Sequence, residues 1–255
     1  MLTFISCAKT MTEKKTVTLP AASTPLFIEE ARHIALSMTN RTTDELADML
    51  HVNPQIAART GLLFRAFFEK GDGKIPALSA YTGMVFRHIA PQDFTKEDWI
   101  YARQHLFITS FLYGLLRPSD LIRNYRLEGN VRLSENEGHT LFDFWRSRLT
   151  DTFISAIRRE GGILINLASS EMKRLFDWTR VIRETQVVTP DFHIYKNGKL
   201  STVVVYTKMC RGEMVRFILK NRIENPEDLK LFRWEGYRFN PEESRGNHWI
   251  FTLSE

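Results

Sequence analysis

Two adjacent glycines, Gly161 and Gly162, separate a long helical pattern from a short apolar run, and this arrangement constrains the fold strongly. The pattern over 140–159 is typical of a helix, and glycine commonly ends helices. The run from Ile163 to Leu167 has the length and composition of a buried strand. Serines in 168–171 can then cap a new helix. A helix, a buried strand and another helix start within so few residues predict helices packed on a sheet.

The same alternation continues on both sides of this region. Residues 2–6 have a short strand pattern, and Asn197-Gly198 lies between the β-favouring runs 192–195 and 202–206, which predicts a two-residue hairpin. Capping-box signatures at Thr42 and Thr95 predict helices. We expect the second of these to continue to Phe111. Other helices are expected from Pro25, from Asn53-Pro54 and over 208–222, and a C-terminal strand pair around Tyr237 and 249–253.

These patterns predict a mixed α/β (α+β) fold, in which a mixed sheet is flanked by helices. The chain has 255 residues, 43% of them hydrophobic, which is enough for one large core. No repeat or long linker divides the chain. We expect a compact single domain over 1–255.

The charge balance is mildly basic. There are 35 lysines and arginines against 30 aspartates and glutamates, and the net charge is +5. Such an excess is compatible with a nucleic-acid partner, but a slightly basic enzyme would have the same composition. The positions of the basic residues along the chain therefore have to distinguish a nucleic-acid-binding protein from an enzyme.

The cysteine content and the N-terminal segment indicate the cellular compartment in which the protein is expected. Cys7 and Cys210 are the two cysteines, which excludes a disulfide framework and favours a reducing compartment. The opening apolar run is too short for a signal peptide, and no stretch has membrane-spanning length. We expect a soluble, cytoplasmic monomer without a membrane or an obligate protein partner.

The segment from Leu112 to Ile122 predicts a helix corner. Gly114 can end one helix and Pro118 can occupy the first turn of the next, an arrangement that resembles a degenerate helix-hairpin-helix. In that motif, backbone N–H groups of the hairpin and of the next helix bind a phosphate. Arg117 would add a charge-assisted contact. An ordinary helix corner with Gly114 as its cap is the alternative, because Leu116 stands where the motif usually has a second glycine.

The predicted helix over 208–222 has a basic side. Cys210, Met214 and Phe217 gather on one face at helical spacing, which leaves the basic residues on the remaining arc. A basic helical face can bind phosphates, although solvated faces of this kind are common. The basic residues are Lys208, Arg211, Arg216, Lys220 and Arg222.

Polar residues follow two of the predicted strands. The first strand leads into the loop 6–10, and the strand at 163–167 leads into residues that end at Glu171. Strand ends are where α/β proteins place their ligands. Exposed loop residues and helix capping explain the same segments without a ligand. The candidate pocket residues here are Ser6, Lys9, Thr10, Asn166, Ser169 and Glu171.

Several kinds of site lack support in the sequence. The seven histidines form no HExxH or Cys/His grouping, and no GxSxG or GxGxxG fingerprint occurs. We therefore expect no metal site and no cofactor, and direct iron sequestration is disfavoured.

Taken together, these segments resemble the YaaA family of peroxide-stress proteins along nearly the whole chain. Residues 4–10 are similar to the family's ISPAKT opening, except that Cys7 replaces the proline. Cys210 likewise stands where the family usually has alanine. Buried, inert cysteines and a redox role both remain open for these two positions. The other matching segments are 81–83 (YTG), 112–118 (LYGxLRP), 125–128 (YRLE), 165–169 with Glu171 (INLAS and its acid), 211–217 (RGxMxRF) and Gly236-Tyr237.

The resemblance implies a positively charged groove, DNA binding, and protection of DNA during oxidative stress with a link to limiting free iron. The leading hypothesis is therefore a DNA-binding protein that holds duplex or distorted DNA by its backbone phosphates on a basic cleft. The residues expected to bind DNA are Lys9, Tyr113, Gly114, Arg117, Arg126, Lys208, Arg211 and Arg216.

The alternative hypothesis is an enzyme that acts on a nucleobase or nucleotide. Its pocket would form around Lys9, Glu171, Lys208 and Arg211, because these residues lie at strand ends and on a helix, as an active site requires. The sequence assigns no catalytic residue.

Overall fold

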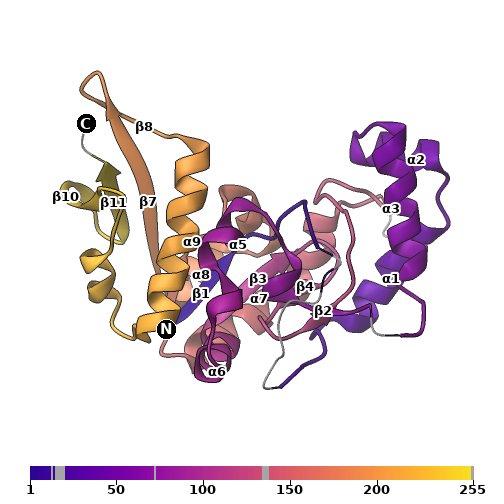
Figure 1. Cartoon of the computed structure of the whole chain (residues 1–255), viewed down its shortest axis with the longest axis horizontal. Coiled ribbons are helices and arrows are strands. Elements are labelled where there is room, and N and C mark those ends of the chain that lie inside the picture. Colours follow the sequence, from indigo (N-terminus) through magenta and orange to yellow (C-terminus); the bar gives the residue numbers. More distant parts are fainter. Residues whose placement is uncertain (13, 15–20, 72, 134–137, 254–255) are drawn as a thin grey trace.

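The centre of the structure is a run of parallel strands within a larger mixed sheet (Figure 1). The computed structural model describes residues 1–12, 14, 21–71, 73–133 and 138–253. The parallel strands are, in spatial order, β3 (Leu106–Ser110), β1 (Leu2–Ile5), β6 (Ile163–Asn166), β7 (Gln186–Lys196) and β11 (His248–Leu253).

Antiparallel strands extend this centre at both edges. β4 (Gly114–Leu116) pairs with β3 at one edge, and β10 (Tyr237–Arg245) and β9 (Arg233–Trp234) follow β11 at the other. β8 (Lys199–Ser201) pairs with the end of β7, and β2 (Ile75–Pro76) pairs with β5 (Leu121–Ile122) as a separate ladder. The predicted mixed α/β fold, with a mixed sheet flanked by helices, is confirmed.

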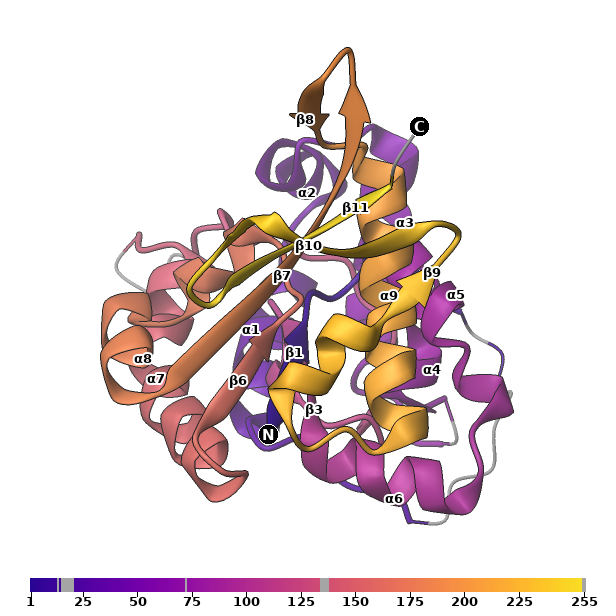
Figure 2. The same ribbon diagram turned by 90° about the vertical axis from the view of Figure 1, so that its left-hand side faces the viewer.

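Helices cover the sheet and form a group beyond one of its ends (Figures 1 and 2). α1 (Ile28–Thr39), α2 (Thr43–Leu50) and α3 (Pro54–Ala66) form that group. The others that the structure describes are α4 (Ala77–Ala80), α5 (Met84–Ile89), α6 (Lys96–His105), α7 (Leu141–Arg159), α8 (Trp178–Glu184) and α9 (Val204–Asn221), with 3-10 turns at Pro91–Asp93 (η1), Ser170–Leu175 (η3) and Pro226–Leu231 (η4). None of these helices combines the length and the apolar character that a membrane span needs.

Local capping sets several helix starts where the sequence predicts them. Thr42, Thr95 and Thr140 each accept a hydrogen bond from the backbone N–H three residues later, and the acid at that position bonds back to the backbone N–H of the threonine. Each pair satisfies two donors that the first helical turn leaves free.

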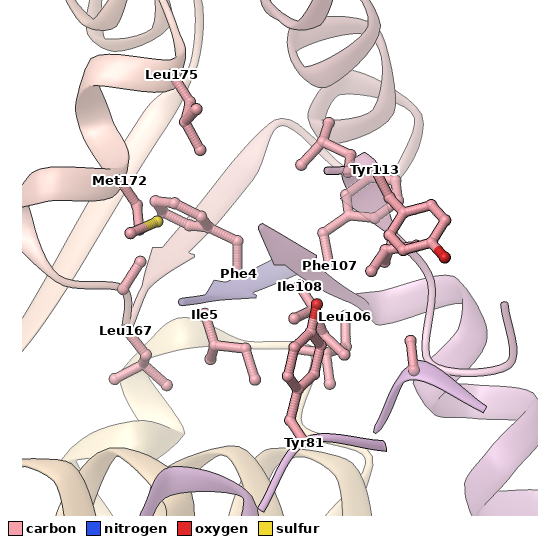
Figure 3. Close-up of a cluster of buried hydrophobic side chains, with 14 of the residues drawn as sticks. Phe4, Ile5, Tyr81, Leu106, Phe107, Ile108, Tyr113, Leu167, Met172 and Leu175 are labelled. Carbon is pink, nitrogen blue, oxygen red and sulfur yellow. The ribbon is translucent and has the colours of Figure 1, made fainter. Parts of the chain in front are cut away.

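The central strands are buried on both faces. Every residue of β1 and β3 is buried, as expected for parallel strands with helices on either side. Phe4 and Ile5 point to opposite faces of β1 (Figure 3). The Phe4 ring packs against the rings of Phe153 on α7 and Phe176, with centroid distances of 5.3 and 6.2 Å. The alternation along β1 thus anchors both helical layers.

The predicted helix-hairpin-helix is not confirmed, because this segment forms a β-hairpin. α6 ends at His105, the chain continues as β3, and β4 returns antiparallel with Ser110 opposite Gly114. Gly114 has a φ of +71°, and a Cβ there would lie 2.8 Å from the Trp145 ring. The buried segment 106–110, which begins with the apolar run 106–108, fits a helix or a strand equally well from its pattern, and pairing with β1 decides for the strand.

The hairpin at Asn197-Gly198 is confirmed, but its second strand is shorter than predicted. Both turn residues have positive φ values, 53° and 70°, as the turn requires. β8 ends at Ser201, and α9 already begins at Val204. The β-branched run 202–205 is therefore divided between a connection and a helix start, because the helix packs on β7 and tertiary packing overrides propensity.

A glycine contact brings α5 and α9 close together. A Cβ on Gly212 would lie 2.3 Å from the carbonyl oxygen of Val85 and 2.7 Å from the Cβ of His88. Only a residue without a side chain fits this approach. The contact fixes the position of α9 relative to the loop that precedes α5.

We predict that Gly212→Ala lowers the free energy of unfolding by about 1–3 kcal/mol, because the added methyl group has to displace the α5 backbone. Gly61→Ala is the matched control, since it is also a glycine within a helix but a Cβ there would meet its nearest atom at 3.4 Å. That control is expected to gain about 0.5–1 kcal/mol. Urea unfolding of both variants measures the difference, and equal effects would contradict the close contact.

Candidate anion-binding pocket

The carboxyl ends of β1 and β6 lie side by side where the chain connections diverge. After β1 the chain continues to β3 on one side, whereas after β6 it continues to β7 on the other. Diverging connections leave a crevice beyond the strand ends, and open α/β sheets bind ligands there. The loops 6–10 and 167–171, which the sequence analysis selected, both leave these two strand ends.

A pocket of about 470 Å³ occupies this position, and we call it the sheet-end pocket. Its volume is in the range of small-molecule sites. Apolar side chains and cationic side chains both contribute to its walls. The lining residues are 6–10, 83–86, Phe111, 125–128, Leu167, Ser169, Glu171, Met172, Lys208 and Arg211.

Two serines join the loops at the base of the pocket. The Ser6 hydroxyl donates a hydrogen bond to Ser169 Oγ at 3.1 Å and accepts one from the Ser169 backbone N–H at 2.9 Å. The backbone N–H of Leu167 also donates to the carbonyl of Phe4 at 3.1 Å. These bonds hold the two loops in one arrangement, although their residues are more than 160 positions apart.

Four cations from three parts of the chain reach the pocket, and two of them share one carboxylate. Lys9 Nζ lies 2.9 Å from a carboxylate oxygen of Glu128, and the Arg126 guanidinium lies 3.8 Å from the same oxygen. The Lys9 side chain is 67% exposed, so this ion pair is weak and can exchange for another anion. Within the part of the chain that the structure describes, the side chains of Lys208 and Arg211 form no ion pair and no hydrogen bond.

Two of the four cations, Arg126 and Arg211, have a buried Nε without a hydrogen-bond partner among the described residues. Burial lowers the pKa of Arg211, while the negative charge of Asp191 acts in the opposite direction. The guanidinium stays protonated because its ordinary pKa is so high. A buried donor without a partner is costly, so an anion in this pocket would be stabilised.

A chain of buried hydroxyl groups lies behind the pocket wall. Tyr125 Oη is 2.8 Å from Tyr81 Oη and 2.7 Å from Ser110 Oγ. Burial raises the pKa of both phenols well above the ordinary value, so both stay neutral. This network therefore shapes the wall without adding charge.

Both cysteines have thiols that resist ionisation. Burial raises the pKa of Cys7, which lines the pocket, to about 12, and hydrogen bonding to Tyr125 offsets only part of this rise. Burial likewise raises the pKa of Cys210 to about 12. The thiolate is the reactive form of cysteine, so these raised pKa values lower the reactivity of both thiols near neutral pH.

The pocket includes four of the eight residues that the sequence analysis assigned to DNA binding: Lys9, Arg126, Lys208 and Arg211. It also includes Ser6, Thr10, Ser169 and Glu171 from the candidate pocket set. Asn166 lies outside, because its side chain donates to Thr189 Oγ1 at 3.3 Å and lines a neighbouring pocket.

The other four predicted DNA-binding residues lie elsewhere. Tyr113 and Gly114 are buried in the hairpin between β3 and β4. Arg117 pairs with the buried Asp120 at 2.9 Å and lines a cavity at the amino ends of β1 and β3. Arg216 pairs with Asp93 at 3.2 Å and donates to the carbonyls that end α5. The predicted helix corner would have placed Tyr113, Gly114 and Arg117 at a surface. In the structure, the hairpin buries Tyr113 and Gly114, and Asp120 pairs with Arg117.

Two acidic residues near the cations received no role from the sequence. Glu128 ends the YRLE segment that contains Arg126, so the role expected for Arg126 could have pointed to Glu128. Asp191 lies within β7, where the sequence offers no signal for it. In the ranges that the structure describes, no three His, Cys, Asp or Glu side chains are arranged to hold a metal ion.

The fold and the pocket define an α/β protein with a basic candidate anion-binding site at the carboxyl edge of its parallel strands. The profile of the family described as peroxide stress protein YaaA matches residues 1–243. A UPF0246 protein of Phocaeicola vulgatus is 56% identical over 253 residues, which cover 99% of each chain. UPF0246 proteins of Bacteroides fragilis (54% over 252 residues; 99% of this chain and 98% of the relative) and Clostridium beijerinckii (35% over 254 residues; 99% and 97%) are similar along the same length.

The chain belongs to the peroxide stress protein YaaA family. The resemblance drawn from the sequence motifs is thus confirmed. The family's name is consistent with a role in peroxide stress.

We predict that neither thiol is alkylated at an appreciable rate in the folded protein near neutral pH. Because the pKa of each thiol is about 12, the reaction with iodoacetamide should accelerate only at strongly alkaline pH or after unfolding in urea. Mass spectrometry of the labelled protein measures this. Rapid modification of Cys7 at pH 7.5 in the folded state would contradict its protonated state.

Proposed function

We propose that this protein acts in the peroxide-stress response by binding DNA in the cytoplasm, with backbone phosphates held by the cations of the sheet-end pocket. One observation carries the proposal: Lys9, Arg126, Lys208 and Arg211 converge from three parts of the chain on one pocket. Lys208 and Arg211 are the main phosphate ligands, since they have no competing carboxylate within ion-pair distance among the described residues.

The contacts made this way are to phosphates and carry no base sequence information. Phosphate contacts position a protein on DNA, whereas base edges specify sequence. Binding should therefore show weak sequence preference and depend strongly on salt, because each neutralised phosphate releases counterions. Glu128 and Glu171 lie at the same pocket and reduce its net positive charge, so a few phosphates rather than a long stretch of backbone are bound.

We predict that Lys208→Gln and Arg211→Gln each weaken binding to duplex DNA roughly tenfold at low salt and reduce the slope of log K against log salt by about 1. The matched control is Arg103→Gln, which removes one exposed positive charge at the cavity by the amino ends of β1 and β3. Its affinity should stay within about twofold of the wild type. Fluorescence anisotropy across a salt series measures these constants. A dissociation constant that does not change with salt would remove the basis of the proposal.

A second candidate function, an enzyme acting on a nucleobase or nucleotide, is favoured by the volume and composition of the same pocket. Phe86, Phe111 and Met172 provide apolar walls that suit a flat ring, and the cations suit a phosphate. Glu171 is exposed at the pocket, and its carboxyl group is able to move a proton there.

We predict that Glu171→Gln separates the two functions. If the protein is an enzyme, this substitution abolishes turnover of a nucleotide, because the amide cannot accept or donate the proton as the carboxyl group does. DNA affinity should remain unchanged or rise slightly, since a negative charge beside the phosphate is removed. Chromatography of incubated deoxynucleosides and deoxynucleotides detects turnover, and its absence with wild-type protein rejects the enzymatic candidate.

A further inference from the structure

A second pocket lies directly behind one wall of the sheet-end pocket. Its volume is about 540 Å³, similar to the first. Arg211 lines both pockets, so its side chain stands between them. We call the second one the Trp178 pocket; its lining includes Asn166, Lys173, Trp178, Ile182, Asn247 and His248.

The rest of the partition is the segment that follows β6. Leu167, Ser169 and Glu171 face the sheet-end pocket, whereas Asn166, Ala168 and Ser170 face the Trp178 pocket. Successive side chains of an extended segment point to opposite sides, and the backbone at Ser169 is extended, with a φ of −68° and a ψ of 157°. One backbone layer and one guanidinium thus separate the two pockets.

The Trp178 pocket has the two kinds of surface that a nucleotide needs. Trp178 is half-buried against Phe4, at a ring distance of 5.8 Å, and Ile182 beside it is 55% exposed. The Lys173 ammonium lies 5.3 Å from the Trp178 ring centroid and forms no ion pair among the described residues. Asn247 and His248 supply exposed polar groups to the same pocket. An aromatic ring beside a cation is the combination that binds bases and phosphates of single strands.

The acid in this pocket already has two imidazole side chains as neighbours. Asp191 Oδ2 lies 3.4 Å from His193 Nε2 and 3.7 Å from His248 Nε2. The pKa of Asp191 is lowered overall: burial alone would raise it, and this is outweighed by His193, by a backbone hydrogen bond from Phe192 and by Arg211. Three cations therefore have no carboxylate at ion-pair distance among the described residues: Lys208, Arg211 and Lys173. Lys208 and Arg211 line the sheet-end pocket, and Arg211 and Lys173 line the Trp178 pocket.

We infer that the Trp178 pocket is a second nucleotide subsite, which accepts the neighbouring nucleotide of a DNA strand whose bridging phosphate lies on Arg211. This inference rests on the proposed DNA binding at the sheet-end pocket. The bridging phosphate supplies an anionic partner for the Arg211 guanidinium, which lines both pockets and has no ion pair among the described residues. Lys173 moves from the face of Trp178 to the terminal phosphate or sugar edge, and a base takes its place on the ring.

Calorimetric titration with two probes tests the inference: the mononucleotide pT and the dinucleotide pTpT. Wild-type protein is expected to bind pTpT at least tenfold more tightly than pT. Trp178→Leu and Lys173→Gln should remove this gain and leave the affinity for pT unchanged. Lys173→Gln keeps the test valid if the loss of Trp178 disturbs the core. Lys196→Gln, an exposed lysine at the end of β7 beside the hairpin turn, is the matched control and should keep the full gain.

The outcomes separate this inference from the function on which it rests. Equal affinities for pT and pTpT, in a protein whose DNA binding depends on Lys208 and Arg211, would overturn the second subsite and leave the proposed function standing. Failure of pT, pTpT and duplex DNA to bind would overturn both. Quenching of tryptophan fluorescence by pTpT that persists in Trp178→Leu would also overturn the placement of a base on this ring.

Discussion

The parallel pairing of β1 with β3 on one side and β6 on the other is the interaction on which the candidate site depends. Phe4 lies opposite Phe107 in one ladder and opposite Asn166 in the other, so this register sets where each strand ends. Because the strands are parallel, their carboxyl ends meet at one edge of the sheet. The hydrogen bonds between Ser6 and Ser169 are a consequence of that register, and so is the crevice above them.

The close approach of α5 and α9 at Gly212 completes the pocket. It places the first turns of α9 beside the loops from β1 and β6, which brings Lys208 and Arg211 to the same cavity as Lys9 and Arg126. The packing that positions Arg211 also buries it, and its Nε has no partner in the described part of the chain. The stabilisation that an anion would gain near Arg211 thus follows from the close packing of the two helices.

Local signals were sufficient wherever a short stretch of residues decides its own structure. The capping boxes at Thr42 and Thr95 and the turn at Asn197-Gly198 formed as predicted, because their hydrogen bonds and backbone angles involve near neighbours. The segment 106–110 was predicted as helix and is a strand, because its short apolar run 106–108 suits either element and pairing with β1 makes the choice. That one error produced the helix-hairpin-helix prediction, and with it the roles expected for Tyr113, Gly114 and Arg117.

By itself, the sequence determined the family, the mixed α/β class and the two strand ends that carry polar residues, since motifs and strand ends are properties of contiguous segments. Only the tertiary structure decided which cations share a pocket: it grouped Lys208 and Arg211 with Lys9, and it turned Arg216, on the same helix, toward Asp93. It also revealed the Trp178 pocket, whose wall of alternating side chains separates two cavities. The physical reason is that ion pairs and cavities depend on distances between segments far apart in the chain, and sheet register and helix packing set those distances.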